Sequence, residues 1–188
     1  MIKTKKNLKS VAIFGLLASL YLTPSWAEQM KPFSLPSLQG GSTISSDAAK
    51  GKVAIVDFWA SWCEPCKASF PAYNNLLSKF GSKGLVIIGV NIDNDKEKAV
   101  GFLEETPANF LLAADPDKKV AAAYNLPTMP TSYIIGRDGN ILYTHAGYHE
   151  GDLAGMEKKV EDALNQNKGA SNKNEGAPTQ NEGPSEQE

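Results

Sequence analysis

The chain has 188 residues, which is the size of one domain with appendages, and its 41% hydrophobic and 21% charged residues exclude a wholly disordered or fibrous protein. Its formal net charge is −2, and without residues 1–27 the chain keeps 15 basic and 21 acidic residues, a net charge of −6. Because no basic stripe remains to neutralise phosphates, we predict no nucleic-acid partner. Two cysteines are too few for a disulfide scaffold or a four-cysteine zinc site.

Residues 1–27 have the three parts of a secretory signal peptide. Four lysines lie in the first nine residues, an apolar run of 12 residues covers Val11 to Leu22, and Ser25 and Ala27 supply small residues for cleavage. The run is short for a membrane span, which needs about 20 apolar residues. We therefore predict a signal peptide at 1–27, with an uncleaved anchor as the alternative. Export to the periplasm follows, where disulfides form and persist.

Residues 167–188 contain no Val, Ile, Leu, Met or aromatic residue. Such a segment cannot bury enough apolar surface to offset the entropy lost on ordering, so we predict a disordered C-terminal tail. What lies between, residues 28–166, has the length of a single domain.

The first half of this domain predicts a hairpin, a buried strand and a helix. Residues 33–44 alternate around two glycines, which favours a short hairpin. Residues 53–60 (VAIVDFWA) form a nearly continuous apolar run, typical of a strand buried on both faces, and Asp57 is its one charge. Residues 64–80 carry Phe70, Tyr73, Leu77 and Phe80 at helical spacing.

The second half alternates strand and helix patterns before a terminal hairpin and helix. We predict strands at 85–90, 110–112, 131–135 and 141–144, and helices at 96–105, at 118–124 and around Leu153 to Leu164. The order implies an α/β fold in which helices flank a mixed central β-sheet, with an N-terminal hairpin and a helix-strand-helix insert.

The two cysteines stand three residues apart, where the buried strand meets the helix. Cys63 and Cys66 form a C-x-x-C motif there, which is a specific redox signal. Residues three apart lie on one side of the first helical turn, so their sulfurs can meet. The exposed amides and macrodipole of a helix N-terminus favour an anion, which makes Cys63 the better thiolate and attacking group. Cys66, one turn deeper, would be the resolving cysteine.

Two other interpretations of the motif stay open. A static structural disulfide is one, although a loop this short gains little from closure entropy. A metal site is the other: zinc would need two further ligands, and His145 and His149 are the only histidines, whereas copper could be held by two cysteines. We expect redox chemistry with no bound metal.

Residues 56–67 (VDFWASWCEPCK) resemble the active-site segment of the thioredoxin superfamily. The signal peptide, the Glu64-Pro65 dipeptide, the insert and the run from Pro130 to Gly139 resemble its TlpA/ResA-like branch, over about residues 30–165. The resemblance implies a thioredoxin-like fold and an extracytoplasmic thiol-disulfide oxidoreductase, commonly a reductant in cytochrome c maturation or related thiol repair. It implies no organic cofactor.

The resemblance also assigns roles to residues outside the motif. Pro130 matches the cis-proline that lies opposite the C-x-x-C, with Pro127 as its rival, and the backbone of Met129 would then pair with the substrate. Asp57 matches a buried carboxylate, which suits proton transfer at Cys66. Trp62 is expected on an apolar docking surface, whereas Trp59 fits the core. The residues that we expect to contact the substrate are thus Trp62, Glu64, Pro65 and Met129.

One position departs from the ResA-like pattern: Ser69 stands where some members carry Glu, three residues after the second cysteine. Proton handling would then fall to Asp57 alone, and a client specialised to cytochrome c is less well supported. We predict a monomeric reductant of disulfides in exported proteins, supplied with electrons by a membrane thiol transporter. A disulfide oxidant or isomerase, and a copper-binding chaperone that uses the same thiols, are the alternatives.

Overall fold

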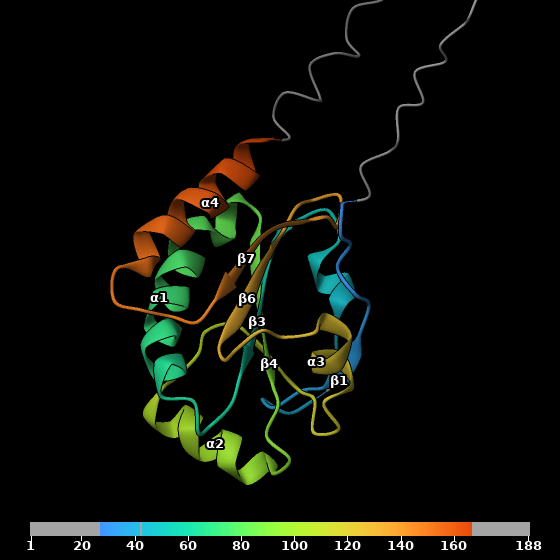
Figure 1. The fold of residues 1–188 in the computed structure, drawn as a ribbon, viewed down its shortest axis with the longest axis vertical. Helices are drawn as coiled ribbons and strands as arrows, with labels where there is room; N and C mark the ends of the chain where they lie inside the picture. The colour runs from blue at the N-terminus through green and yellow to red at the C-terminus, as the bar shows by residue number, and fades with distance from the viewer. Residues whose placement is uncertain (1–26, 42, 167–188) are drawn as a thin grey trace, which may run out of the picture.

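The fold is built on a five-stranded mixed sheet. The computed structural model describes residues 27–41 and 43–166. The central strand β3 (Val53–Trp59) pairs in parallel with β4 (Leu85–Asn91) and antiparallel with β6 (Thr131–Ile135). Outside these lie β5 (Leu111–Ala114), parallel to β4, and β7 (Ile141–Ala146), antiparallel to β6, in the order β5-β4-β3-β6-β7 (Figure 1). Every residue of β3 is buried, because both faces of the sheet are covered.

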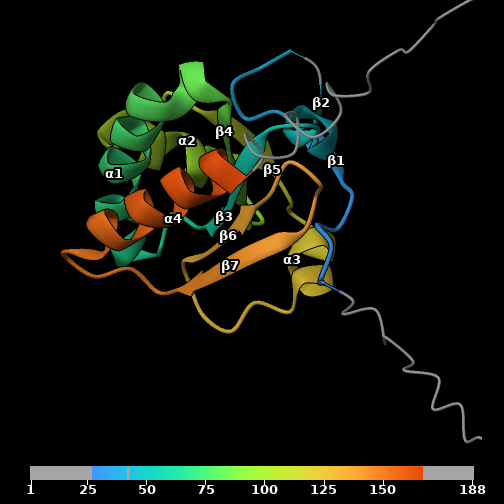
Figure 2. The ribbon, with the colours of Figure 1, turned by 90° about the horizontal axis from the view of Figure 1, so that it is seen from above.

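Three helices cover one face of the sheet. They are α1 (Glu64–Phe80), α2 (Lys96–Glu105) and α4 (Asp152–Gln166) (Figures 1 and 2). Phe70 of α1 meets Trp59 of β3 and Phe102 of α2, with ring centroids 5.0 and 5.1 Å apart. Aromatic packing of this kind is worth about 0.5–1.5 kcal/mol per pair beyond area burial, and it fixes the start of α1 against the end of β3.

Smaller elements cover the opposite face. There lie the short helix α3 (Lys119–Tyr124) and the antiparallel hairpin of β1 (Ser34–Pro36) and β2 (Thr43–Ser45), followed by the 3-10 turn Ser46–Ala49 (Figure 2). Phe58 of β3 packs against Tyr124 of α3 at 5.0 Å between ring centroids. Phe58 and Trp59 therefore point to opposite faces of the sheet, as the two-residue period of a strand requires.

The α/β architecture expected from the sequence is confirmed. The helices 64–80 and 96–105 and the strand 131–135 have the predicted bounds, and the other elements differ by one or two residues at their ends, where strand patterns merge into loops. The predicted insert is present as α2, β5 and α3. The predicted tail, and the predicted signal peptide apart from Ala27, lie outside the described residues. Among the described helices, none combines the length and apolar character needed to cross a membrane.

Candidate active site

Cys63 and Cys66 form a disulfide at the first turn of α1. Their Cα atoms are 5.4 Å apart, and Cys63 is the N-cap of the helix. Pro65 stands in the first turn, where a missing N–H leaves no helical hydrogen bond unmade, and Cys66 donates its backbone N–H to the carbonyl of Cys63 at 3.1 Å. Cys66 is fully buried and Cys63 retains 3% of its surface, so Cys63 is the cysteine nearer to solvent.

The loop before Cys63 is held by an aspartate that the sequence analysis did not identify. Asp93 follows β4 and accepts hydrogen bonds from the backbone N–H of Ser61 at 2.8 Å and from its hydroxyl at 3.0 Å. Asn91 donates to the same carboxylate at 2.8 Å. The parallel pairing of β3 with β4 brings these two loops to one edge of the sheet. The polar residues Asn91 and Asp93, which follow the predicted strand 85–90, were the available signal.

Asp57 lies on β3, fully buried, beside two hydroxyl groups. Its Oδ1 accepts hydrogen bonds from Tyr73 of α1 at 3.0 Å and from Ser132 of β6 at 2.8 Å, and the two hydroxyl oxygens are 2.6 Å apart. Its Oδ2 is buried and has no hydrogen-bond partner among the residues that the structure describes. Burial raises the pKa of Asp57 to about 7, although both hydrogen bonds lower it.

Tyr73 and Ser132 come from segments distant in the sequence. The register of the sheet sets Ser132 opposite Asp57, while Tyr73 lies seven residues after Cys66 on the same helix. Seven residues are close to two helical turns, so Tyr73 and Cys66 lie on one side of α1. Burial and the neighbouring Asp57 carboxylate raise the pKa of Tyr73 well above its ordinary value, which keeps its hydroxyl protonated as a donor.

The peptide bond between Met129 and Pro130 is cis, and the Leu126–Pro127 bond is not. Thr131, the next residue, pairs with Phe58 of β3, so the proline stands level with the end of the strand that leads to Cys63. Pro130 is buried, and Met129 is half-buried. The structure thus brings the proline turn and the cysteine loop to the same edge of the sheet.

Around the disulfide, the side chains differ widely in exposure. Trp62 is 65% exposed, whereas Trp59 is fully buried. Glu64 is exposed and lies 3.9 Å from Lys67, which also lies 3.5 Å from Glu105. Ser69 is buried and donates its hydroxyl hydrogen to the carbonyl of Cys66 at 3.0 Å.

His145 and His149 lie at the end of β7 and before α4, where both approach Asp152, at 3.1 and 3.5 Å. Within residues 27–41 and 43–166, no group of three or more His, Cys, Asp or Glu side chains is arranged to hold a metal ion.

Comparison with known proteins places this geometry in a family. The Redoxin family pattern matches residues 27–164. The thiol-disulfide oxidoreductase ResA of Bacillus subtilis is 34% identical over 107 residues, which are 57% of this chain and 60% of ResA. ResA of Bacillus thuringiensis is 31% identical over 121 residues, 64% of this chain and 70% of that protein. The matched segment thus spans about 60% of the length of the first of these relatives.

Two solved structures support the same family assignment. A Chlorobium tepidum protein assigned as the thiol:disulfide interchange protein DsbE superposes with a TM-score of 0.71 and 35% identity, covering 73% of this chain and 96% of that one. A Neisseria meningitidis protein assigned as a thioredoxin superposes with a TM-score of 0.65 and 26% identity, covering 76% and 94%. The chain therefore belongs to the Redoxin family, and within the thioredoxin superfamily it is a TlpA/ResA-like protein.

Proposed function

We propose that this protein is an extracytoplasmic thiol-disulfide oxidoreductase that reduces disulfides in exported proteins. The observation that carries the proposal is the Cys63–Cys66 disulfide at the N-terminus of α1, where Cys63 retains 3% of its surface and Cys66 is fully buried. A helix N-terminus stabilises a thiolate, and a pair held this way can cycle between disulfide and dithiol without unfolding. The names of the ResA relatives support the same activity.

The reaction follows from which sulfur a client can reach. In the reduced protein the Cys63 thiolate attacks one sulfur of a client disulfide, forming a mixed disulfide while the other client sulfur leaves as a thiolate. Cys66 then attacks the sulfur of Cys63, which releases the second client thiol and restores the Cys63–Cys66 disulfide. Two electrons pass to the client in total, and its two sulfurs leave as thiolates that take up protons, one equivalent to the proton that Cys66 releases and one from solvent.

The second step requires the thiol of Cys66 to lose its proton. Asp57 is the buried carboxylate on the side of β3 that faces α1, and a pKa of about 7 lets it exchange a proton near neutral pH. Tyr73 and Ser132 occupy Oδ1, so Oδ2 is the oxygen left to take the proton. Ser69 donates its hydroxyl hydrogen to a backbone carbonyl, and a hydroxyl is too weak a base to take this proton, so Asp57 is the proton acceptor in this proposal.

Client binding would use the surface beside the disulfide. Met129 precedes the cis-proline, and its backbone can pair with an extended client strand. Trp62, the residue before Cys63, offers an exposed aromatic ring. Glu64 and Pro65, which stand between the two cysteines and are both exposed, belong to the same proposed client-binding surface. The protein would act as a monomer.

The reducing direction is supported by the two residues between the cysteines. The exposed carboxylate of Glu64 opposes a negative charge on Cys63, and Pro65 lacks a backbone N–H that could stabilise the sulfur. A less stable thiolate makes the dithiol a better reductant. A thiol transporter in the membrane would supply electrons to this protein in the periplasm. Cytochrome c maturation is the pathway that the TlpA/ResA-like resemblance offers, and apocytochrome c is therefore a client to test.

Paired cysteine variants test the proposal. Cys66→Ser should accumulate mixed disulfides with clients through Cys63, because attack survives and resolution does not. Cys63→Ser should form none and should lose disulfide reduction. Non-reducing electrophoresis with mass spectrometry of both variants, expressed in the same host with the full chain, distinguishes them. Mixed disulfides that accumulate on Cys63→Ser alone would reverse the assigned roles, and equal accumulation on both variants would overturn them.

A further inference from the structure

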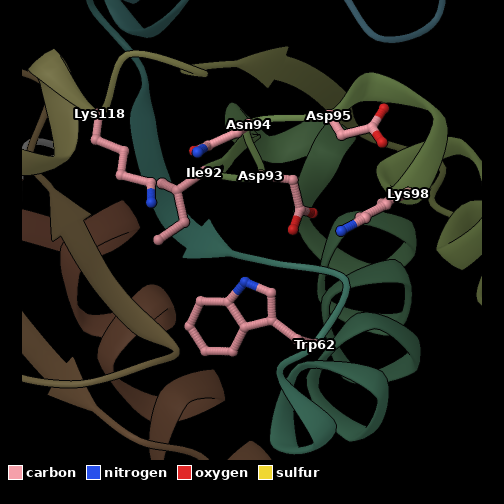
Figure 3. A pocket seen from close by; sticks show the side chains of 7 residues that line it. All are labelled: Trp62, Ile92, Asp93, Asn94, Asp95, Lys98 and Lys118. Atoms are coloured by element: carbon pink, nitrogen blue, oxygen red, sulfur yellow. The ribbon is translucent and has the colours of Figure 1, made fainter.

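A depression of about 190 Å³ lies beside Trp62, the residue that precedes Cys63. Trp62 lines it from the loop after β3, and residues 92–95 line it from the loop after β4. Lys98 of α2 and Lys118, the residue before α3, complete the lining (Figure 3). Four separate segments thus meet at the residue that precedes Cys63. A polypeptide bound with its cysteine at Cys63 would therefore place neighbouring side chains over this depression.

The acidic groups of the depression are engaged by the protein itself. Asp93 is 5% exposed, and its carboxylate already accepts the hydrogen bonds from Ser61 and Asn91. Asp95 is the N-cap of α2, and its Oδ1 accepts a hydrogen bond from the backbone N–H of Glu97 at 3.1 Å. In Figure 3, the side chain of Asp95 points outward. These two carboxylates stabilise the loops that line the depression, so they have little hydrogen-bonding capacity left for a cationic group of a client.

The lysines of the depression differ in this respect. Lys98 and Lys118 are both exposed, and neither forms an ion pair or side-chain hydrogen bond within the described part of the chain, whereas nearby Lys67 lies close to Glu64 and Glu105. Figure 3 shows the two ammonium groups reaching from opposite sides toward the space above the Trp62 ring. Two ammonium groups, which carry six N–H donors between them, thus line one depression beside Trp62, and a carboxylate is the group that matches them.

We infer that this depression selects client segments that carry an Asp or Glu side chain beside the reacting cysteine, held by Lys98 and Lys118 against Trp62. The inference deepens the proposed function and rests on it. The rest of the protein would oppose such a client, because the chain beyond residue 27 is net acidic. The local pair of lysines would therefore confer selectivity for the position of the acid as well as for its sign.

Two disulfide-bonded peptides that differ only in Glu or Gln next to the reactive cysteine test the inference. The pre-reduced full chain, in a single turnover that needs no external reductant, is mixed with each peptide, and the second-order rate constants for peptide reduction are measured. We expect the Glu peptide to react about fivefold faster, which is the size expected from two solvent-exposed ion pairs. Raising NaCl from about 50 to 500 mM should bring the ratio toward one, because salt screens exposed charges.

The double variant Lys98→Gln/Lys118→Gln should lower the ratio to near one. Lys96→Gln/Lys119→Gln is the matched control. It removes two exposed lysines that lie within two residues of Lys98 and Lys118 in the sequence but do not line the depression, and it should keep the wild-type ratio. A wild-type ratio near one, insensitivity of the ratio to salt, or an equal loss in both double variants would overturn the inference while leaving the reductase proposal intact. Failure of the wild type to reduce either peptide would instead overturn the proposed function.

Discussion

Replacing Asp57 with asparagine should stabilise the oxidised protein at alkaline pH and change its stability little near pH 4. Burial raises the pKa of this carboxyl from 3.8 to about 7 in the folded protein. Between these values the unfolded chain has released the proton and the folded protein has kept it, so stability falls as pH rises. At 1.36 kcal/mol per pH unit, ionisation of Asp57 costs the folded protein about 4 kcal/mol by pH 8.

Asparagine removes this cost because it cannot ionise. It has the same shape, and its amide oxygen can accept the hydrogen bonds that Tyr73 and Ser132 donate to Asp57. The variant should therefore gain up to about 4 kcal/mol over the wild type at pH 8, most of it appearing between pH 4 and 7. Its turnover should nevertheless fall, because the proposed proton acceptor for Cys66 is lost.

Urea denaturation of the oxidised wild type and variant at several pH values from 4 to 8.5 measures the difference directly. The disulfide form is used so that neither cysteine titrates. Asp162→Asn is the control: it alters an exposed carboxylate beside Lys158, and it should stay within about 1 kcal/mol of the wild type throughout. A stability difference between Asp57→Asn and the wild type that is the same at pH 4.5 and 8 would refute the buried-carboxyl argument.

Three further outcomes are expected. Equilibration with dithiothreitol or glutathione should give a reduction potential nearer to about −270 mV than to about −120 mV, and a value above about −180 mV would favour the oxidant or isomerase alternative. Gly89→Val should lower the free energy of unfolding by about 1–3 kcal/mol in urea titrations, because a Cβ at Gly89 would lie 3.0–3.1 Å from Leu112, Phe110 and Trp59, all buried. Deleting residues 167–188, which contain no large apolar side chain, should leave the melting temperature unchanged within a few degrees in a calorimetric scan.

The sequence by itself determined the order and type of the elements. The continuous apolar run of β3 and the 3.6-residue spacing of Phe70, Tyr73 and Phe80 in α1 are local patterns, so they can be read without knowing the fold. The C-x-x-C motif is local as well, and its position between strand and helix was sufficient to place Cys63 at the helix N-terminus. The exact ends of the strands were harder to predict from the sequence, because hydrogen bonding to the neighbouring strand decides where a strand ends.

Only the tertiary structure decided what surrounds the two cysteines. Asp57 was recognisable as an anomaly in a buried strand, but its partners Tyr73 and Ser132 lie 16 and 75 residues away in the chain. Asp93 reaches Ser61 across 32 residues, and Lys118 approaches Trp62 from a different element again. Such contacts are set by sheet register and by which loops share an edge of the sheet, and neither leaves a periodic trace in the sequence. The pKa of Asp57 depends on the same packing, since burial by distant segments, rather than any neighbour in sequence, removes water from its carboxyl group.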